Sequence, residues 1–191
     1  MKKNEIVRQL LKQSRFLAFT SEDLKRYERR HRSGKYVYAR FGFPWSDNRG
    51  NSRKSLSIAV RTELKDIFAE LKAAFSDSNH ELNYASLRAE AGKPVLQRIV
   101  FDILSADLLV FDLAYRNPNV LFELGIAYAI GAKAFLLLPD GIELPSDLSG
   151  LTYCKYKNPE DFSLDRTARE DIKRAMREVL KRKLSENHAG R

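Results

Sequence analysis

The sequence predicts an α/β fold in which helices cover both faces of a doubly wound, mostly parallel sheet of about five strands. Short apolar runs alternate along the chain with longer segments of helical periodicity, which is the pattern of repeated β-α-β units. Two of these runs, Leu108–Phe111 and Ala134–Leu138, are continuously apolar, as is typical of strands buried on both faces. The 191 residues are 43% hydrophobic and show no linker or internal repeat, which indicates one globular domain.

Two helices are predicted before the first strand, and they form a basic N-terminal helical extension over residues 1–34. The second helix begins at Thr20, where Asp23 three residues later gives a capping box, and it ends near Gly34. The first helix, Asn4–Leu17, carries an apolar stripe made of Ile6, Val7, Leu10, Leu11 and Leu17.

The α/β domain is predicted over residues 35–184, followed by a frayed tail at residues 185–191. Its expected strands are Tyr36–Phe43, Glu81–Leu87, Leu108–Phe111, Ala134–Leu138 and Leu151–Tyr156. Its expected helices are Ser57–Phe75, Pro94–Ser105, the segment from Asn117 to Gly131, and Leu164–Leu184.

The segment from Asn117 to Gly131 has clear signals at both ends. Asn117 is a suitable N-cap, and Pro118 suits the first helical position because its missing N–H has no helical partner there. Gly131 suits the end of a helix. Apolar residues surround this helix nearly all round, so we expect it to be buried in the domain.

Glu123 is the only charged residue between Val120 and Ala132. A carboxylate in such surroundings must be paired, hydrogen-bonded or protonated, because burying it alone is unfavourable. Asp112 ends the preceding strand, and ligands of open α/β sheets bind at the carboxyl ends of the strands. Two interpretations follow: the two acids lie close together and form a catalytic pair, or Glu123 pairs with an arginine while Asp112 caps a loop.

The stretch NPNVLFELGIAYAIG, preceded by SADLLVFDLAYR, resembles the signature of the TIR-like and nucleoside 2-deoxyribosyltransferase-like group. The resemblance covers roughly Ile103 to Tyr156 and implies a flavodoxin-like sheet. Three positions depart from the pattern of the group: Ala114 replaces a threonine, Phe122 a tyrosine and Tyr128 a frequent histidine.

The resemblance also implies a chemistry. In that group the glutamate of the ELG motif cleaves or exchanges N-glycosidic bonds, and here this role falls on Glu123. Asp112 matches the aspartate that helps to place the sugar or the base, and Asn117 and Asn119 of the NPN motif are candidate substrate-binding residues. The implied activity is hydrolysis of NAD, as a substrate rather than a cofactor, by an immune effector active in antiphage defence.

Two alternatives of different kinds remain open. One is a nucleoside 2-deoxyribosyltransferase or a nucleotide N-glycosidase. The other is a module without turnover that senses a nucleotide or assembles through TIR-type contacts. The resemblance implies a homo-oligomer, and we expect the apolar stripe of the first helix to contribute to self-association.

The polar loop after the first strand is a candidate ligand-binding segment. Related enzymes use this loop to line the pocket, and the helix that follows could offer an anion site at its N-terminus. The alternative is an ordinary surface loop. Its candidate residues are Phe43 and Trp45 for stacking on a base, with Arg49, Arg53 and Lys54 for phosphate.

The net charge of +9 is concentrated at the ends of the chain. Residues 1–35 hold 11 Lys+Arg against 4 Asp+Glu, whereas the region of the predicted sheet is close to neutral. We interpret the excess as solvated helix faces and expect no nucleic-acid partner, because no nucleic-acid-binding motif accompanies it.

Other chemistries lack their residues in this sequence. Cys154 is the only cysteine and the three histidines are scattered, so no zinc spacing is present and we expect neither metal nor cofactor. One cysteine and no visible signal peptide favour a reducing compartment, so we expect a cytoplasmic protein without membrane association.

The loop yields a test that depends on the sequence alone. If Arg53 holds a phosphate of the ligand, Arg53→Ala should raise KM for a phosphorylated substrate more than it lowers kcat. Arg49→Ala and Lys54→Ala serve as companions in the same steady-state assay. An unchanged KM in all three variants would exclude the loop as the anchor of the ligand.

Overall fold

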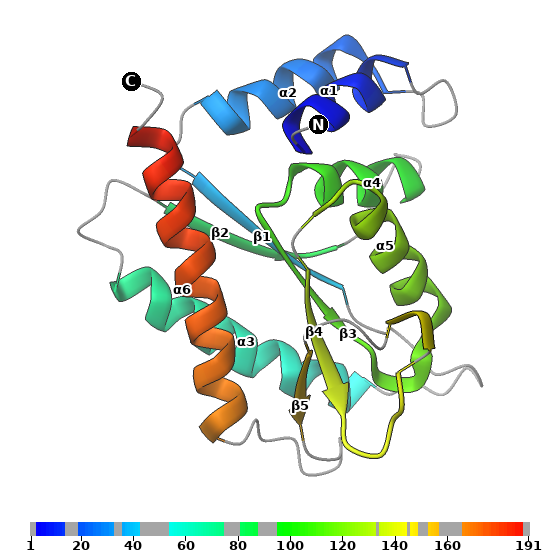
Figure 1. The fold of residues 1–191 in the computed structure, drawn as a ribbon, viewed down its shortest axis with the longest axis vertical. Helices are drawn as coiled ribbons and strands as arrows, with labels where there is room; N and C mark the ends of the chain where they lie inside the picture. Colours follow the sequence, from blue (N-terminus) through cyan, green and yellow to red (C-terminus); the bar gives the residue numbers. More distant parts are fainter. Residues whose placement is uncertain are drawn as a thin grey trace.

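A computed structural model gives the fold of the chain over residues 3–13, 19–32, 36–42, 54–74, 81–87, 95–132, 134–144, 146–148, 153–156 and 166–188. Five parallel strands form one sheet in the order β2-β1-β3-β4-β5 (Figure 1). The doubly wound five-stranded α/β fold predicted from the sequence is therefore confirmed. Every neighbouring pair of strands in this sheet is parallel.

The elements follow one another in the alternating order that the sequence predicts, and their bounds differ from the predictions by only a few residues. The strands are β1 Tyr36–Gly42, β2 Glu81–Ser86, β3 Leu108–Asp112, β4 Ala134–Pro139 and β5 Tyr153–Tyr156. The helices are α1 Lys3–Gln13, α2 Ser21–Arg32, α3 Lys54–Ala74, α4 Val95–Ser105, α5 Pro118–Ala129 and α6 Arg166–His188, with short 3-10 helices at Ala114–Arg116 and Ser146–Leu148.

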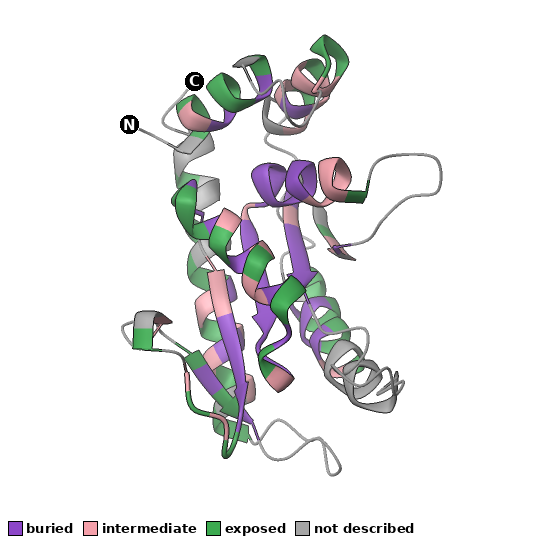
Figure 2. Ribbon diagram, turned by 90° about the vertical axis from the view of Figure 1, so that its right-hand side faces the viewer, coloured by how far each residue is buried: buried purple, intermediate pink, exposed green. Residues whose placement is uncertain are grey.

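The sheet is covered on both faces, and the alternation along β3 shows which helices lie on which side. Leu109 and Phe111 belong to one apolar cluster together with buried residues of α4 and α5. Leu108 and Val110 belong to a second cluster with buried residues of α3 and α6. We call these two sides the α4–α5 layer and the α3–α6 layer. Covering on both sides explains the continuous apolar run of β3, whose five residues are all buried (Figure 2).

The N-terminal helices α1 and α2 pack on the α4–α5 side of the domain (Figure 1). Val7 and Leu11, on the predicted stripe of α1, are buried in the same cluster as Phe101 of α4. The hydroxyl of Tyr27 donates a hydrogen bond to Asn4 Oδ1 at 2.9 Å, which joins α2 to α1. These two residues of the stripe complete the core of their own domain, whereas Leu10 of the same stripe is 38% exposed and Leu17 lies outside the described residues. Self-association through this helix stays a prediction.

The capping box at the start of α2 is confirmed. Thr20 Oγ1 accepts a hydrogen bond from the Asp23 backbone N–H at 3.2 Å, and Asp23 Oδ2 accepts one from the Thr20 backbone N–H at 2.8 Å. These two bonds satisfy donors at the helix terminus that would otherwise lack partners.

Three arginines converge on the buried Asp102 of α4. Arg98 Nε lies 3.0 Å from Asp102 Oδ2, while Arg30 Nη1 and Arg40 Nε lie 3.6 Å and 3.9 Å from Oδ1. Arg30 comes from α2 and Arg40 from β1, so one carboxylate joins the N-terminal extension, the sheet and the layer above it. Burial lowers the pKa of both Arg30 and Arg40, and the nearby Asp102 opposes that shift.

Aromatic rings complete the environment of these arginines. The guanidinium carbon of Arg30 lies 4.9 Å from the ring centroid of Tyr38 and 5.2 Å from that of Phe101. A guanidinium at these distances is attracted to the face of the ring. The interpretation of the basic extension as solvated helix faces is therefore wrong for Arg30, although Arg29 of the same helix is exposed and pairs with Glu22.

The outer side of α5 also departs from expectation. The helix was expected to be buried all round, yet the side chains of Phe122 and Tyr128 are 56% and 40% exposed. A helix in an outer layer has only one side against the sheet, and Leu124 and Ala127 occupy that side. The exposed side of α5 therefore carries apolar residues.

Two further facts concern the helices. The last one, α6, continues to His188, beyond Ser185 where a frayed tail was expected. Within the described ranges, no helix combines the length and the apolar character needed to cross a membrane.

The cluster around Asp102 gives a prediction about stability. Asp102→Asn removes the carboxylate that the three arginines share, so it should lower the free energy of unfolding by about 3–5 kcal/mol. Urea unfolding monitored by circular dichroism measures the difference. The matched control is Asp171→Asn, which breaks a solvent-exposed ion pair with Arg174 and should change stability by no more than about 0.5 kcal/mol. Equal effects of the two substitutions would contradict the importance of the buried cluster.

Candidate functional site

The strand order creates a topological switch point between β1 and β3. The chain leaves β1 through α3 to reach β2 on one side, and then returns through α4 to β3 on the other side of β1. The connections that follow β1 and β3 therefore diverge to opposite faces. Ligands of open α/β sheets bind at such a switch point, outside the carboxyl ends of the strands.

Glu123 reaches this point from α5. Asn117 starts the helix as predicted, since its Oδ1 accepts hydrogen bonds from the backbone N–H groups of Asn119 at 3.0 Å and Val120 at 3.4 Å. A helix that begins there presents Glu123 in its second turn. A β-carbon built on Gly42 would lie 2.8 Å from Glu123 Oε2, so the carboxylate lies directly against the last residue of β1.

The surroundings of the Glu123 carboxylate are apolar. The ring of Phe111 lies on the same side of the sheet, with its Cδ1 atom 2.6 Å from that built β-carbon on Gly42. Burial raises the pKa of Glu123 to about 7. Within the described part of the chain, the carboxylate makes no hydrogen bond or ion pair, so the expected alternative of an arginine partner finds no support there. A half-buried acid without such compensation is a candidate for chemistry rather than for stability.

Asp112 lies on the other face of the sheet. Asp112 comes two residues after Val110 in β3, so its side chain points to the same side of the sheet as Val110, toward the α3–α6 layer. Phe111 and Glu123 belong to the α4–α5 side. Asp112 and Glu123 therefore approach the sheet from different sides, because successive side chains of a strand point to opposite faces. The expectation that Asp112 orients Glu123 or the ribose hydroxyls stays a prediction.

The contacts of Asp112 fasten the ends of two strands. Its Oδ1 accepts hydrogen bonds from the Ala114 backbone N–H at 3.0 Å and from the Tyr156 hydroxyl at 2.8 Å. Burial raises the pKa of Asp112 to about 6, and the two hydrogen bonds oppose that shift. The bond to Asp112 also contributes, after burial, to the raised pKa of Tyr156. Asp112 thus holds the turn after β3 against the end of β5.

The turn between β3 and α5 is conformationally strained. Tyr115 and Arg116 have φ angles of 62° and 48°, in the left-handed region that non-glycine residues seldom occupy. The hydrogen bond from Ala114 to Asp112 fixes the start of this turn, and Arg116 Nη2 donates to the Glu143 carbonyl oxygen at 2.9 Å. Strain of this kind is concentrated at functional sites in proteins.

The structure describes only some of the remaining predicted site residues. Asn117 is buried and its side-chain oxygen caps α5, while Asn119 is exposed in the first turn of that helix. Lys54 begins α3, and its side chain lies outside the described residues. Four further candidates also lie outside the described residues: Phe43, Trp45, Arg49 and Arg53.

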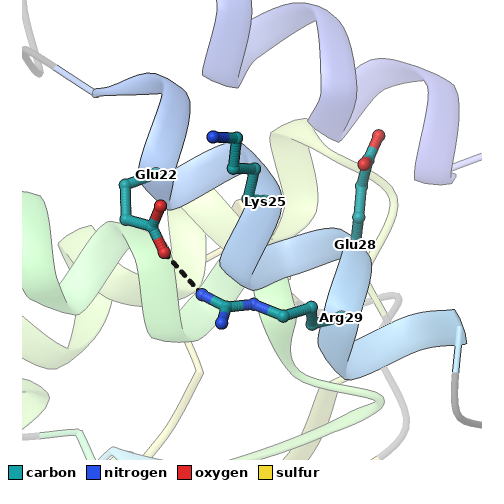
Figure 3. A pocket seen from close by; sticks show the side chains of 4 residues that line it. All are labelled: Glu22, Lys25, Glu28 and Arg29. Carbon is teal, nitrogen blue, oxygen red and sulfur yellow. Dashed lines mark hydrogen bonds and ion pairs between the residues drawn. The ribbon is translucent and has the colours of Figure 1, made fainter.

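A separate surface pocket lies on the N-terminal extension. Glu22, Lys25, Glu28 and Arg29 line it, and all four come from α2 (Figure 3). In Figure 1, α2 lies at the end of the molecule opposite to the arrowhead of β4. The pocket is therefore remote from the carboxyl ends of the strands and does not belong to the Glu123 site. In the described ranges, no three histidine, cysteine or acidic side chains are grouped to hold a metal ion.

Comparison with protein families agrees with this geometry. The family described as CAP12/Pycsar effector protein, TIR domain, matches residues 59–158, which is more than half of the chain. The chain belongs to this family. The matched part of the TIR domain begins within α3, ends just after β5, and contains both Glu123 and Asp112. No curated protein matches the chain at a significant level.

Sequence reasoning missed the immediate neighbours of Glu123 in the TIR domain. The Glu123 carboxylate lies against the backbone of Gly42 and beside the ring of Phe111. A lone glycine within a strand is a signal for close approach of another group, and Gly42 in the segment YVYARFGF carries that signal. The partner that approaches it cannot be read from the sequence, since Glu123 lies far along the chain.

The raised pKa of Glu123 predicts how stability depends on pH. The folded state binds the proton of Glu123 more tightly than the unfolded state, where the ordinary value is 4.5. The stability from this proton is complete below the unfolded value and is lost as the pH rises through about 7. Glu123→Gln should therefore gain stability relative to the wild type as the pH rises, by about 2–3 kcal/mol in total.

Urea unfolding at several pH values between about 4 and 8 measures this difference. Asp66→Asn removes a negative charge from an exposed position of α3 and is the control for the change in net charge. A difference between Glu123→Gln and the wild type that stays constant with pH would contradict the buried, unpaired state of the acid.

Proposed function

We propose that this TIR domain cleaves the N-glycosidic bond of a nucleotide, with hydrolysis of NAD to nicotinamide and an ADP-ribose product as the leading activity. One observation carries the proposal: the carboxylate of Glu123, which has no hydrogen bond or ion pair within the described residues, lies at the switch point of the sheet, where ligands of this fold class bind. The family description names effector proteins, and we propose that the chain is likewise an effector of antiphage defence.

Cleavage of the C1′–N bond of NAD requires one negatively charged group from the protein. As the C1′–N bond of NAD breaks, nicotinamide leaves with the bonding electron pair and becomes neutral, so it needs no proton from an acid. The sugar acquires oxocarbenium character, which an ionised Glu123 stabilises or traps as a covalent intermediate. Water then adds to C1′ and releases one proton.

The raised pKa of Glu123 suits this role. Near pH 7 the group is close to half ionised, and a cationic nicotinamide ring bound beside it favours the charged form. Substrate would thus convert the acid to its reactive state on binding. A carboxylate without hydrogen bonds is also less stabilised and more available to an electron-deficient carbon.

The other candidate residues would position the substrate. Asp112 holds the turn from Ala114 to Arg116 and through it the start of α5, and we propose that the ribose hydroxyls bind beside this turn. Stacking of the base on Phe43 and Trp45 remains a prediction from the sequence, as does phosphate binding by Arg49, Arg53 and Lys54.

A role for self-association is also part of the proposal. Val7 and Leu11 of the α1 stripe are buried within their own domain, so we propose a second surface for association between copies. The exposed side of α5, with Phe122 and Tyr128, is apolar and lies on the helix that carries Glu123.

The test is incubation of concentrated pure protein with NAD, with nicotinamide release followed by chromatography. Glu123→Gln should reduce the rate at least about 100-fold while the circular dichroism spectrum is unchanged. For the wild type, kcat/KM should rise with pH through about 7, because the ionised form of Glu123 is the active one.

Asp66→Asn is again the control and should keep the wild-type rate. Undiminished nicotinamide release by Glu123→Gln would refute the assignment. Base exchange with a deoxynucleoside and a free acceptor base, without NAD turnover, would instead identify a deoxyribosyltransferase.

A further inference from the structure

Gly42 occupies a crowded position at the end of β1. A β-carbon at this residue would lie 2.6 Å from Phe111 Cδ1 and 2.8 Å from Glu123 Oε2, both under the 3.0 Å that real β-carbons observe. The backbone of Gly42 is part of a strand, and the glycines with positive φ in the described ranges are Gly131 and Gly141. Glycine is required at position 42 by lack of space and not by backbone conformation.

The other glycines provide the contrast. Gly125 of α5, two residues after Glu123, would meet no atom within 4 Å if it carried a β-carbon. The same holds for Gly131 and Gly141. The close approach at Gly42 is thus a specific property of the place where the carboxylate lies.

The two neighbours of Gly42 differ in their freedom to move. Phe111 has no exposed surface and is held in the core of the α4–α5 layer. Glu123 Oε2 is at the end of a flexible side chain that makes no hydrogen bond or ion pair within the described part of the chain. Any atom added at position 42 would therefore displace the carboxylate first.

We propose that Gly42 is a positioning residue for Glu123: the missing side chain at the end of β1 forms the seat in which the carboxylate is held. Gly42 and Phe111 close this seat on the side of the sheet. The carboxylate is then shielded on that side and presented toward the crevice between the ends of β1 and β3. The catalytic consequence rests on the proposed function, whereas the seat itself does not.

The experiment measures the pKa of the Glu123 carboxyl by ¹³C NMR in the full chain, with Glu123→Gln to assign the signal. Gly42→Ala should push the carboxylate from its seat toward water and lower its pKa by about one unit or more from the wild-type value of about 7. If the proposed activity holds, the same variant should lower kcat at least about tenfold with a smaller change in KM.

Two further variants make the result decisive. Gly125→Ala adds the same methyl group on open space two residues from Glu123, and it should leave both the pKa and the rate at wild-type values. If Gly42→Ala alone does not fold because of the Phe111 contact, Gly42→Ala in a Phe111→Leu background is compared with Phe111→Leu.

The outcomes separate the two proposals. A lowered pKa without any NAD turnover in the wild type supports the seat and refutes the proposed substrate. An unchanged Glu123 pKa in Gly42→Ala, or in the double variant relative to Phe111→Leu, overturns the positioning role whether or not the protein is an enzyme.

Discussion

Parallel pairing of β1 with β3 is the interaction on which the rest of this structure depends. These strands are adjacent in the sheet but separated in the chain by α3, β2 and α4, so their connections must leave toward opposite faces. The switch point between them is a consequence of this route and not of any particular side chain. Gly42 pairs with Phe111 in the same register, which brings the end of β1 under α5 and hence under Glu123.

Two acids on the α4–α5 side, the buried Asp102 and the half-buried Glu123, have opposite surroundings. Asp102 lies close to three arginines, one of which also contacts two aromatic rings, and its charge helps to hold the N-terminal extension onto the domain. Glu123 lies against a glycine and a phenylalanine ring, and burial moves its pKa to about 7. A protein selected only for stability would pair both acids or replace them. The contrast separates an acid that stabilises the fold, Asp102, from one for which we propose a role in the site, Glu123.

Local signals predicted the fold and indicated Glu123 as a candidate residue. Asn117, Pro118 and Gly131 mark the limits of α5 through short-range chemistry that needs no tertiary partner, and a lone charge in an apolar helix drew attention to Glu123. The contact of Asp112 with Tyr156 was not predicted, because it joins the ends of two strands that are distant in the sequence. The convergence of Arg30, Arg40 and Arg98 on Asp102 depends on pairings between distant segments, which no local pattern encodes. Similarly, an apolar composition did not show that Phe122 of α5 would face outward.

The cluster around Asp102 has a consequence for the order of events on the ribosome. Arg30 and Arg40 are synthesised early, but their shared carboxylate and the pairing strand β3 emerge only after α3 and β2. The nascent N-terminal helices therefore lack their docking surface for much of translation, and residues 1–35 keep their net charge of +7 exposed to solvent during that time. Docking of these helices must wait for α4. A pause in translation before Asp102 would leave an unfinished chain whose first helices have nowhere to pack.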